Sequence, residues 1–202
     1  MKELLIDCMP FTFTQQTINE SAGGDGMFIV RGVLQRANAK NQNGRVYPRN
    51  ILEREVQKYN RELVSIRNAL GELDHPESSI VNLKNASHNI REIFFNGDDV
   101  MGVVEILSTP SGNILKELFK NNITVGISSR GMGSVRPLGE GTTEVSDDYN
   151  LIAFDFVSNP STHGAYMRPL NESKSVSGEE DYVCNEWCKS QDIMRKILME
   201  LQ

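Results

Sequence analysis

The sequence predicts an α+β fold in which a mostly antiparallel β-barrel or sandwich carries peripheral helices. Three observations support this class. Branched and aromatic residues recur in short runs, a strong turn signal separates two of these runs, and helical spacing of apolar residues appears only occasionally between them. Strands interrupted by a few helices are typical of an antiparallel sheet with its helices on one side or one end.

The first 26 residues are expected to form a peripheral segment. They hold one short apolar piece, and the glycine-rich run at 21–26 then predicts a flexible break. Residues 27–34 mix branched and aromatic side chains in the manner of a strand. The main domain is therefore expected to span residues 27–170.

A helix is expected at 49–66, because Pro48 is well placed to open it and apolar residues follow on one face. These residues are Ile51, Leu52, Val56, Tyr59 and Leu63. A hairpin should follow at 90–95 and 100–107, since the intervening Asn96-Gly97-Asp98-Asp99 favours a tight turn. Ser111 is then the expected cap of a second short helix.

A short apolar strand at 123–127 is expected to deliver Ser128 at its end, before a glycine-rich loop or irregular hairpin at 131–143. The last clear strand is 151–157. Residues 171–202 are expected to form a linker followed by an amphipathic helix. Its apolar face is marked by Trp187, Ile193 or Met194, Ile197 and Leu201. Packing on its own domain and docking onto a partner helix are both open for this helix.

Composition excludes several functions. The chain has 202 residues and a formal net charge of -6, which makes it a poor candidate for binding nucleic acid. Its cysteines, Cys8, Cys184 and Cys188, are too few for a disulfide framework and indicate a reducing compartment. No histidine lies near Cys184 and Cys188 to complete a metal site, so no metal or cofactor is expected. No apolar run approaches the ~20 residues of a membrane span, so a cytosolic location is expected.

The string Gly126-Ile127-Ser128-Ser129-Arg130-Gly131-Met132-Gly133 offers a candidate nucleophile in Ser128 or Ser129. A serine hydroxyl needs an adjacent base to become reactive. A tight turn after the serine would aim the amides of 129–131 at an oxyanion, and Arg130 would hold that turn, bind a carboxylate or lie in water. Taken alone, the string is more typical of an ordinary loop.

His75 is the best candidate base, because an unperturbed histidine titrates near pH ~6.5. Its bland alternative is a surface turn histidine, and His88 is expected at the surface. Asp155 interrupts the apolar run 151–157, and a carboxylate on a partly buried strand face needs a partner such as a histidine N–H. His163 competes for this third place but is better explained as a loop residue.

Four blocks of the chain then match a known pattern in the same order: Asn43-Gly44-Arg45-Val46-Tyr47-Pro48; Ala69-Leu70-Gly71-Glu72-Leu73 with His75-Pro76; Val125-Gly126-Ile127-Ser128-Ser129-Arg130-Gly131-Met132-Gly133-Ser134; and Asp155 ahead of Pro160-Ser161. Together they resemble the prohead core proteases of T-even-type tailed bacteriophages, which are distantly akin to herpesvirus assemblins. The resemblance covers about residues 27–169.

The resemblance implies a capsid-maturation serine protease with His75 as base and Ser128 as nucleophile, and it maps the family aspartate onto Asp155. The choice of Ser128 over Ser129 depends on this match alone. Asp74 stands where the family has asparagine before the histidine. The rival interpretation is a non-catalytic capsid-core or scaffold protein of the same fold. A hydrolase of small esters is disfavoured because Gly-x-Ser-x-Gly is absent around Ser128.

The resemblance also implies substrates and a setting. Proteases of this family cleave scaffold and major capsid proteins after glutamate, inside the prohead in the host cytoplasm, and process themselves. The matching triplets Leu170-Asn171-Glu172 and Ile18-Asn19-Glu20 make Glu172 and Glu20 the expected self-cleavage sites. We expect a homo-oligomer, and neither nucleic acid nor membrane as a partner.

Overall fold

The computed structural model describes residues 2–8, 27–76, 78–158 and 167–169. Contacts divide the chain into two units, 1–172 and 173–202. All of the described residues lie in the first unit, and the expected C-terminal helix lies outside them.

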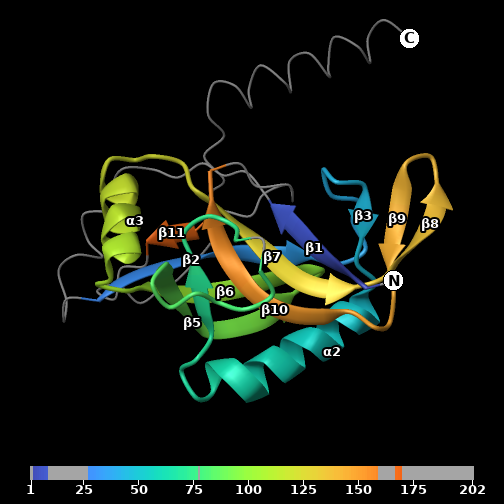
Figure 1. Ribbon diagram of the computed structural model, residues 1–202, viewed down its shortest axis with the longest axis horizontal. Coiled ribbons are helices and arrows are strands. Elements are labelled where there is room, and N and C mark those ends of the chain that lie inside the picture. The colour runs from blue at the N-terminus through green and yellow to red at the C-terminus, as the bar shows by residue number, and fades with distance from the viewer. Residues whose placement is uncertain (1, 9–26, 77, 159–166, 170–202) are drawn as a thin grey trace, which may run out of the picture. The chain divides into compact units, whose positions relative to one another are not determined.

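The described strands fall into three sheets (Figure 1). One sheet has the order β1-β7-β10 and consists of β1 (Glu3–Cys8), β7 (Gly126–Gly133) and β10 (Asn150–Val157). The largest has the order β11-β2-β6-β5-β4 and consists of β2 (Phe28–Arg36), β4 (Leu70–Glu72), β5 (Ala86–Asn96), β6 (Asp99–Ile106) and β11 (Met167–Pro169). The third, β3-β9-β8, consists of β3 (Arg45–Val46), β8 (Val135–Gly139) and β9 (Thr142–Val145).

The pairing is antiparallel throughout these sheets except between β3 and β9. The predicted α+β class is therefore confirmed, although the described strands form open sheets and not a closed barrel. The predicted hairpin is β5–β6, where Asn96 pairs with Asp99. Gly97 in its turn has a φ of 60°, a left-handed conformation that glycine adopts at little cost.

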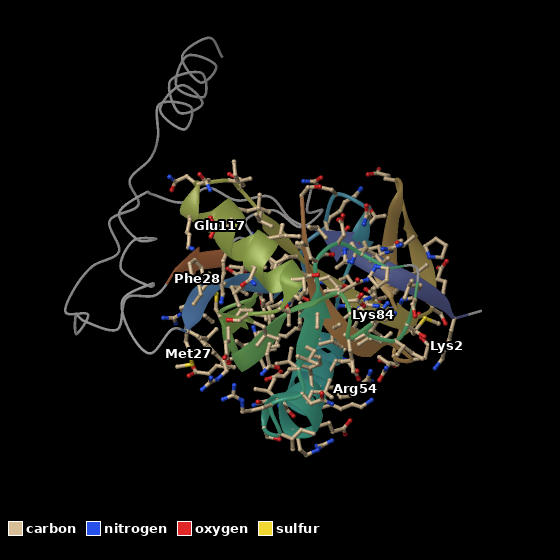
Figure 2. The ribbon with its side chains drawn as sticks, turned by 60° about the vertical axis from the view of Figure 1, so that its left-hand side comes forward. Lys2, Met27, Phe28, Arg54, Lys84 and Glu117 are labelled. Atoms are coloured by element: carbon tan, nitrogen blue, oxygen red, sulfur yellow. The ribbon has the colours of Figure 1, made fainter. Side chains whose placement is uncertain are left out.

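Within the described ranges, two α-helices pack against the sheets. Helix α2 (Arg49–Tyr59) continues into a short π-helical turn, η2 (Asn60–Val64), and contacts β5 and β10. Its predicted apolar face is confirmed by the buried residues Ile51, Leu52, Val56 and Tyr59. Arg54 lies on the opposite side of α2 and is labelled in Figure 2.

Helix α3 (Pro110–Lys120) contacts β5 and β6, and Glu117 lies on its exposed side (Figure 2). Its cap is not Ser111, as the sequence suggested, but Thr109, whose side chain accepts a hydrogen bond of 3.1 Å from the Gly112 amide. The reason is that Pro110 has no N–H to lose and occupies the first helical position, which moves the cap back to Thr109.

The expectation of a peripheral N-terminus is wrong for residues 3–8. Strand β1 pairs with β7 along its whole length, from Glu3 with Gly133 to Cys8 with Ser128. Leu5 and Asp7 are both buried. The short apolar piece therefore forms part of the core. Residues 9–26 lie outside the described part of the chain.

Strand β7 is also longer than predicted. Ser128 is not at its end but two residues inside it, because the strand continues through Gly131 and Gly133. The ring of Tyr149 lies where a side chain at Gly131 would project. Glycine in a strand often marks such a close approach. The glycines that suggested a turn after Ser128 thus allow Tyr149 to pack on a continuous strand.

Strand β1 should contribute measurably to stability. We expect Leu5→Ala to lower the free energy of unfolding by about 2–5 kcal/mol, because Leu5 is 0% exposed and its removal leaves a cavity. Leu138→Ala, at a side chain that is 54% exposed on β8, should change it by less than about 0.5 kcal/mol. Urea unfolding of both variants measures this, and equal effects would contradict a core role for β1.

Candidate active site

The site lies where β10 passes the end of β4. Leu73 forms an isolated parallel bridge with Phe156, and the Asp74 amide donates a hydrogen bond of 2.8 Å to the Phe156 carbonyl. Asp74 has a φ of 68°, which aspartate and asparagine adopt more readily than most residues. This left-handed turn ends the bridge to β10 and places His75 directly after it.

Ser128 and Asp155 face each other on neighbouring strands. They are directly paired in the antiparallel register of β7 and β10, so their side chains point to the same face of the sheet. Both residues are fully buried. His75 approaches this face from its loop, and its side chain is 15% exposed.

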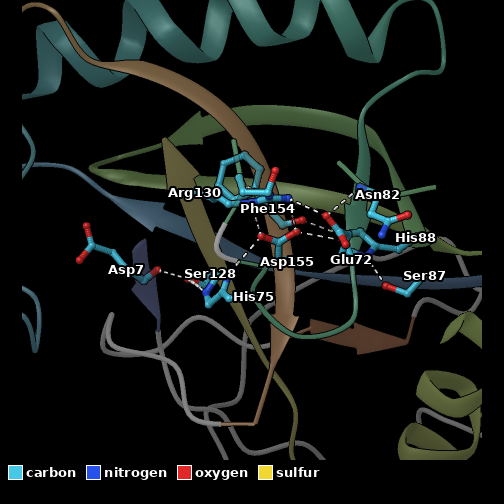
Figure 3. Close-up of polar contacts among 11 residues, drawn as sticks. Asp7, Glu72, His75, Asn82, Ser87, His88, Ser128, Arg130, Phe154 and Asp155 are labelled. Atoms are coloured by element: carbon cyan, nitrogen blue, oxygen red, sulfur yellow. Dashed lines mark hydrogen bonds and ion pairs between the residues drawn. The ribbon is translucent and has the colours of Figure 1, made fainter. Parts of the chain in front are cut away.

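Two hydrogen-bond distances link the three residues (Figure 3). His75 Nδ1 lies 3.1 Å from Asp155 Oδ2, and His75 Nε2 lies 2.7 Å from Ser128 Oγ. An ionised carboxylate can only accept, so in the neutral ring Nδ1 carries the proton and Nε2 presents its lone pair to Ser128. This arrangement lets a histidine take the proton of a serine hydroxyl as the serine attacks.

Ser128 Oγ has a second partner. It donates a hydrogen bond of 2.6 Å to the Asp7 carbonyl, at the end of β1 (Figure 3). A hydroxyl has one proton, so Ser128 cannot donate to Asp7 and to His75 at the same time. In this conformation, the backbone of β1 and the imidazole compete for the proton of Ser128.

The Asp7 side chain fixes that end of β1. Its buried carboxylate accepts hydrogen bonds from Arg45 Nη1 at 2.9 Å and from Asn43 Nδ2 at 2.8 Å, and also from the Tyr47 hydroxyl. The same atoms of Arg45 and Asn43 donate to the Ile6 carbonyl. The block 43–47, prominent in the sequence, therefore anchors the strand that covers Ser128.

The Arg130 side chain is fully buried and contacts protein groups on every side. Its Nε donates to Asp155 Oδ2 at 2.8 Å, and its Nη2 donates to Asp155 Oδ1 at 3.1 Å and to Glu72 Oε1 at 3.2 Å (Figure 3). Nη1 donates to the Ser78 carbonyl at 2.5 Å. Of the roles open to Arg130 in the sequence, lying in water does not fit this structure, because its side chain is buried and paired with carboxylates of the protein.

The amides of 129–131, which the sequence predicts as oxyanion donors, do not follow a tight turn. These residues lie in β7, which pairs with β1 on one side and β10 on the other, so their peptide groups lie within the two ladders. Ser129 points to the opposite face of the sheet from Ser128, where its Oγ accepts a hydrogen bond of 2.7 Å from Gln35 Nε2. Of the two serines, only Ser128 meets His75.

Asp155 is kept ionised by its surroundings. Burial raises the pKa of Asp155. Three contacts lower it by more than that: the hydrogen bond from His75, the charge of Arg130 and the hydrogen bond from the Glu72 amide, which lies 3.0 Å from Oδ1. The net pKa of Asp155 is below its ordinary value. The carboxylate is therefore charged at neutral pH and accepts the Nδ1 proton of His75.

His88 is not a surface residue, as the sequence suggested, but is fully buried under β10. Its Nε2 donates a hydrogen bond of 2.9 Å to the Phe154 carbonyl, and its Nδ1 lies 2.9 Å from Ser87 Oγ. Burial lowers the pKa of His88 to about 4, so the ring is neutral. It holds the peptide group directly before Asp155.

Other expected residues lie outside the described part of the chain, namely His163, Glu20, Glu172, Cys184 and Cys188. Within the described ranges, histidine, cysteine and carboxylate side chains form no cluster suited to a metal ion. The helices described are too short or too polar to cross a membrane. Glu72, which the sequence shows only as part of the block 69–73, is buried on the short strand β4 and belongs to the site.

The geometry is that of a serine–histidine–aspartate site on an α+β fold. The chain belongs to the prohead core protein serine protease family, whose profile matches residues 3–175. It is 33% identical over 159 residues to the prohead core protein protease of Enterobacteria phage T4, covering 77% of this chain and 74% of that protein. It also resembles the solved bacteriophage T4 capsid assembly protease, with a TM-score of 0.68 and 27% identity, over 77% of this chain and 98% of that one. The family inferred from the sequence is confirmed, and the chain is a protease.

The buried neutral His88 should make the protein less stable in mild acid. Its pKa is about 4 when folded and near 6.5 when unfolded, so between these values the unfolded state binds more protons. Stability is thus lost as the pH falls from 7 to 5, by about 2 kcal/mol from this residue. Urea unfolding at both pH values should show a smaller loss in His88→Gln, and equal losses would contradict this account.

Proposed function

We propose that this chain is a serine endopeptidase in which Ser128 is the nucleophile, His75 the general base and Asp155 the residue that orients His75. Ser128 Oγ attacks the peptide carbonyl carbon while His75 Nε2 takes its proton. The same proton then passes to the leaving amine as the C–N bond breaks. Water, activated by His75, hydrolyses the resulting ester and restores Ser128.

The single observation that carries this proposal is the line of contacts from Asp155 through His75 to Ser128. The distances of 3.1 Å and 2.7 Å are hydrogen-bond distances at both ring nitrogens. Asp155 also has a lowered pKa and is therefore charged when the reaction needs it. A non-catalytic capsid-core protein of the same fold has no need of this alignment, which disfavours that rival.

Substrate access requires a change at β1. Ser128 is buried, and its hydroxyl donates to the Asp7 carbonyl. A substrate carbonyl that approaches Oγ must displace the Asp7–Cys8 end of the strand. The Ser128 hydroxyl then donates to His75 Nε2 in place of the Asp7 carbonyl. The described conformation then corresponds to a resting state.

The setting follows from the relatives. Because they are a prohead core protease and a capsid assembly protease, we infer that this chain acts inside a phage prohead in the host cytoplasm. Its substrates are then scaffold or core proteins and the major capsid protein, cut after glutamate. We place self-cleavage after Glu172 and Glu20 and expect a homo-oligomer.

Intact mass after expression tests the nucleophile. We expect the wild type and Ser129→Ala to lose mass at glutamate sites, and Ser128→Ala to stay full length, since loss of the nucleophile slows the reaction by at least about three orders of magnitude. Ser129→Ala is a matched control, because the two serines are adjacent but face opposite sides of the sheet.

Scaffold and capsid proteins are added to each variant as substrates in trans. Cleavage by Ser128→Ala at the wild-type rate would refute the assigned nucleophile. Intact substrates with every variant, including the wild type, would favour the non-catalytic rival. Fragments ending at residues other than glutamate would retain the protease and refute the cleavage specificity.

A further inference from the structure

Arg130 is more deeply involved in the site than its sequence position suggests. Its guanidinium is 0% exposed and bridges both oxygens of Asp155, using Nε and Nη2. Such a forked contact fixes the plane of a carboxylate, which a single donor cannot do. Because His75 Nδ1 binds Asp155 Oδ2, the fork on Asp155 also fixes the direction in which the imidazole is held.

The same guanidinium reaches the loop that carries His75. Nη1 donates to the Ser78 carbonyl, three residues beyond His75. Nη2 contacts Glu72 Oε1, which in turn accepts a hydrogen bond of 3.0 Å from the Asn82 amide. Arg130 therefore joins the strand of Ser128, the strand of Asp155 and both sides of the His75 loop.

Two buried carboxylates share this one cation. Arg130 stands between the buried carboxylates of Asp155 and Glu72, which are 0% and 1% exposed at their side chains. Glu72 Oε2 has no hydrogen-bond partner within the described ranges, so Arg130 is the cation that compensates Glu72. A buried charge without a partner is strongly unfavourable. Each carboxylate thus depends on the same guanidinium.

We propose that Arg130 is a positioning residue of the reaction, which orients Asp155 and, with Glu72 as its counter-charge, sets the pH at which His75 becomes an effective base. This inference rests on the proposed function of Ser128, His75 and Asp155.

The direction of the effect follows from the charges that face Asp155. The charged groups are Arg130 on β7 and Glu72 on β4, and His75 approaches from its loop. Two further titratable groups, His88 on β5 and Tyr59 on α2, are neutral, because burial lowers the pKa of His88 and raises the pKa of Tyr59. Removing the Arg130 cation favours protonation of the Asp155–His75 pair. Removing the Glu72 anion disfavours it. The two changes therefore move the titration of the pair in opposite directions.

The test is the rate at which a fluorophosphonate probe labels Ser128 between about pH 5 and 9. In that step Ser128 Oγ bonds to phosphorus, fluoride leaves and His75 accepts the hydroxyl proton. On the acidic side of the pH–rate profile, the acidic limb, the labelling rate falls as His75 becomes protonated. Arg130→Met should move this limb to higher pH by about one pH unit, and Glu72→Gln should move it to lower pH. Arg130→Lys keeps the charge but loses the two-nitrogen contact with Asp155. Its Ser128 should therefore be labelled more slowly, with the acidic limb at nearly the same pH.

Arg61→Met is the matched control, because Arg61 is 72% exposed in η2 and should leave both rate and limb unchanged. Circular dichroism establishes which variants fold. If Arg130→Met does not fold, Glu72→Gln and Arg130→Lys still test the proposal. The proposal would be overturned if the acidic limb of Glu72→Gln stayed at the wild-type pH or moved to higher pH.

A second readout separates this inference from the proposed function. If the wild type is labelled at a serine other than Ser128, the assigned nucleophile fails. If no serine is labelled because Ser128 stays buried, the inference is tested by the second readout alone. The His75 ring is then titrated by NMR in Ser128→Ala, alone and combined with Glu72→Gln or Arg130→Lys. A lower midpoint of the His75 titration with Glu72→Gln supports the role of the Arg130–Glu72 pair. The same midpoint in all three proteins overturns that role.

Discussion

The arrangement of the site depends on one constraint, that buried charges must be compensated. Asp155 and Glu72 are carboxylates without solvent, and Arg130 is the cation that meets both. Because these residues come from β10, β4 and β7, the three strands can pack only in the relation that brings the charges together. The ion-pair network is thus a geometric restraint on the fold, whatever its net contribution to stability.

Hydrogen bonds made by side chains extend this restraint between the sheets. His88 of β5 holds the Phe154 carbonyl, the Glu72 amide holds Asp155, and Gln35 of β2 holds Ser129. A shift of β7 against β10 by one residue would turn Ser128 and Asp155 to opposite faces. These cross-sheet bonds oppose such a shift because each would leave a buried polar group without a partner.

The residues of the site were more predictable than the backbone that carries them. An aspartate inside an apolar run and a histidine in a stiff turn are local signals, so Asp155 and His75 could be found from their neighbours. The length of β7 could not, because its glycines are explained by the ring of Tyr149, which is distant in the chain. The burial of His88 and the pairing of β1 with β7 likewise arise from contacts between remote segments, which no local pattern contains.

The pairing of β1 beside Ser128 joins two segments that are far apart in the sequence. The backbone of Asp7 contacts the hydroxyl of Ser128, so β1 forms one wall of the candidate site. Substitutions within residues 3–8 therefore change the surroundings of Ser128, although more than a hundred residues separate the two segments.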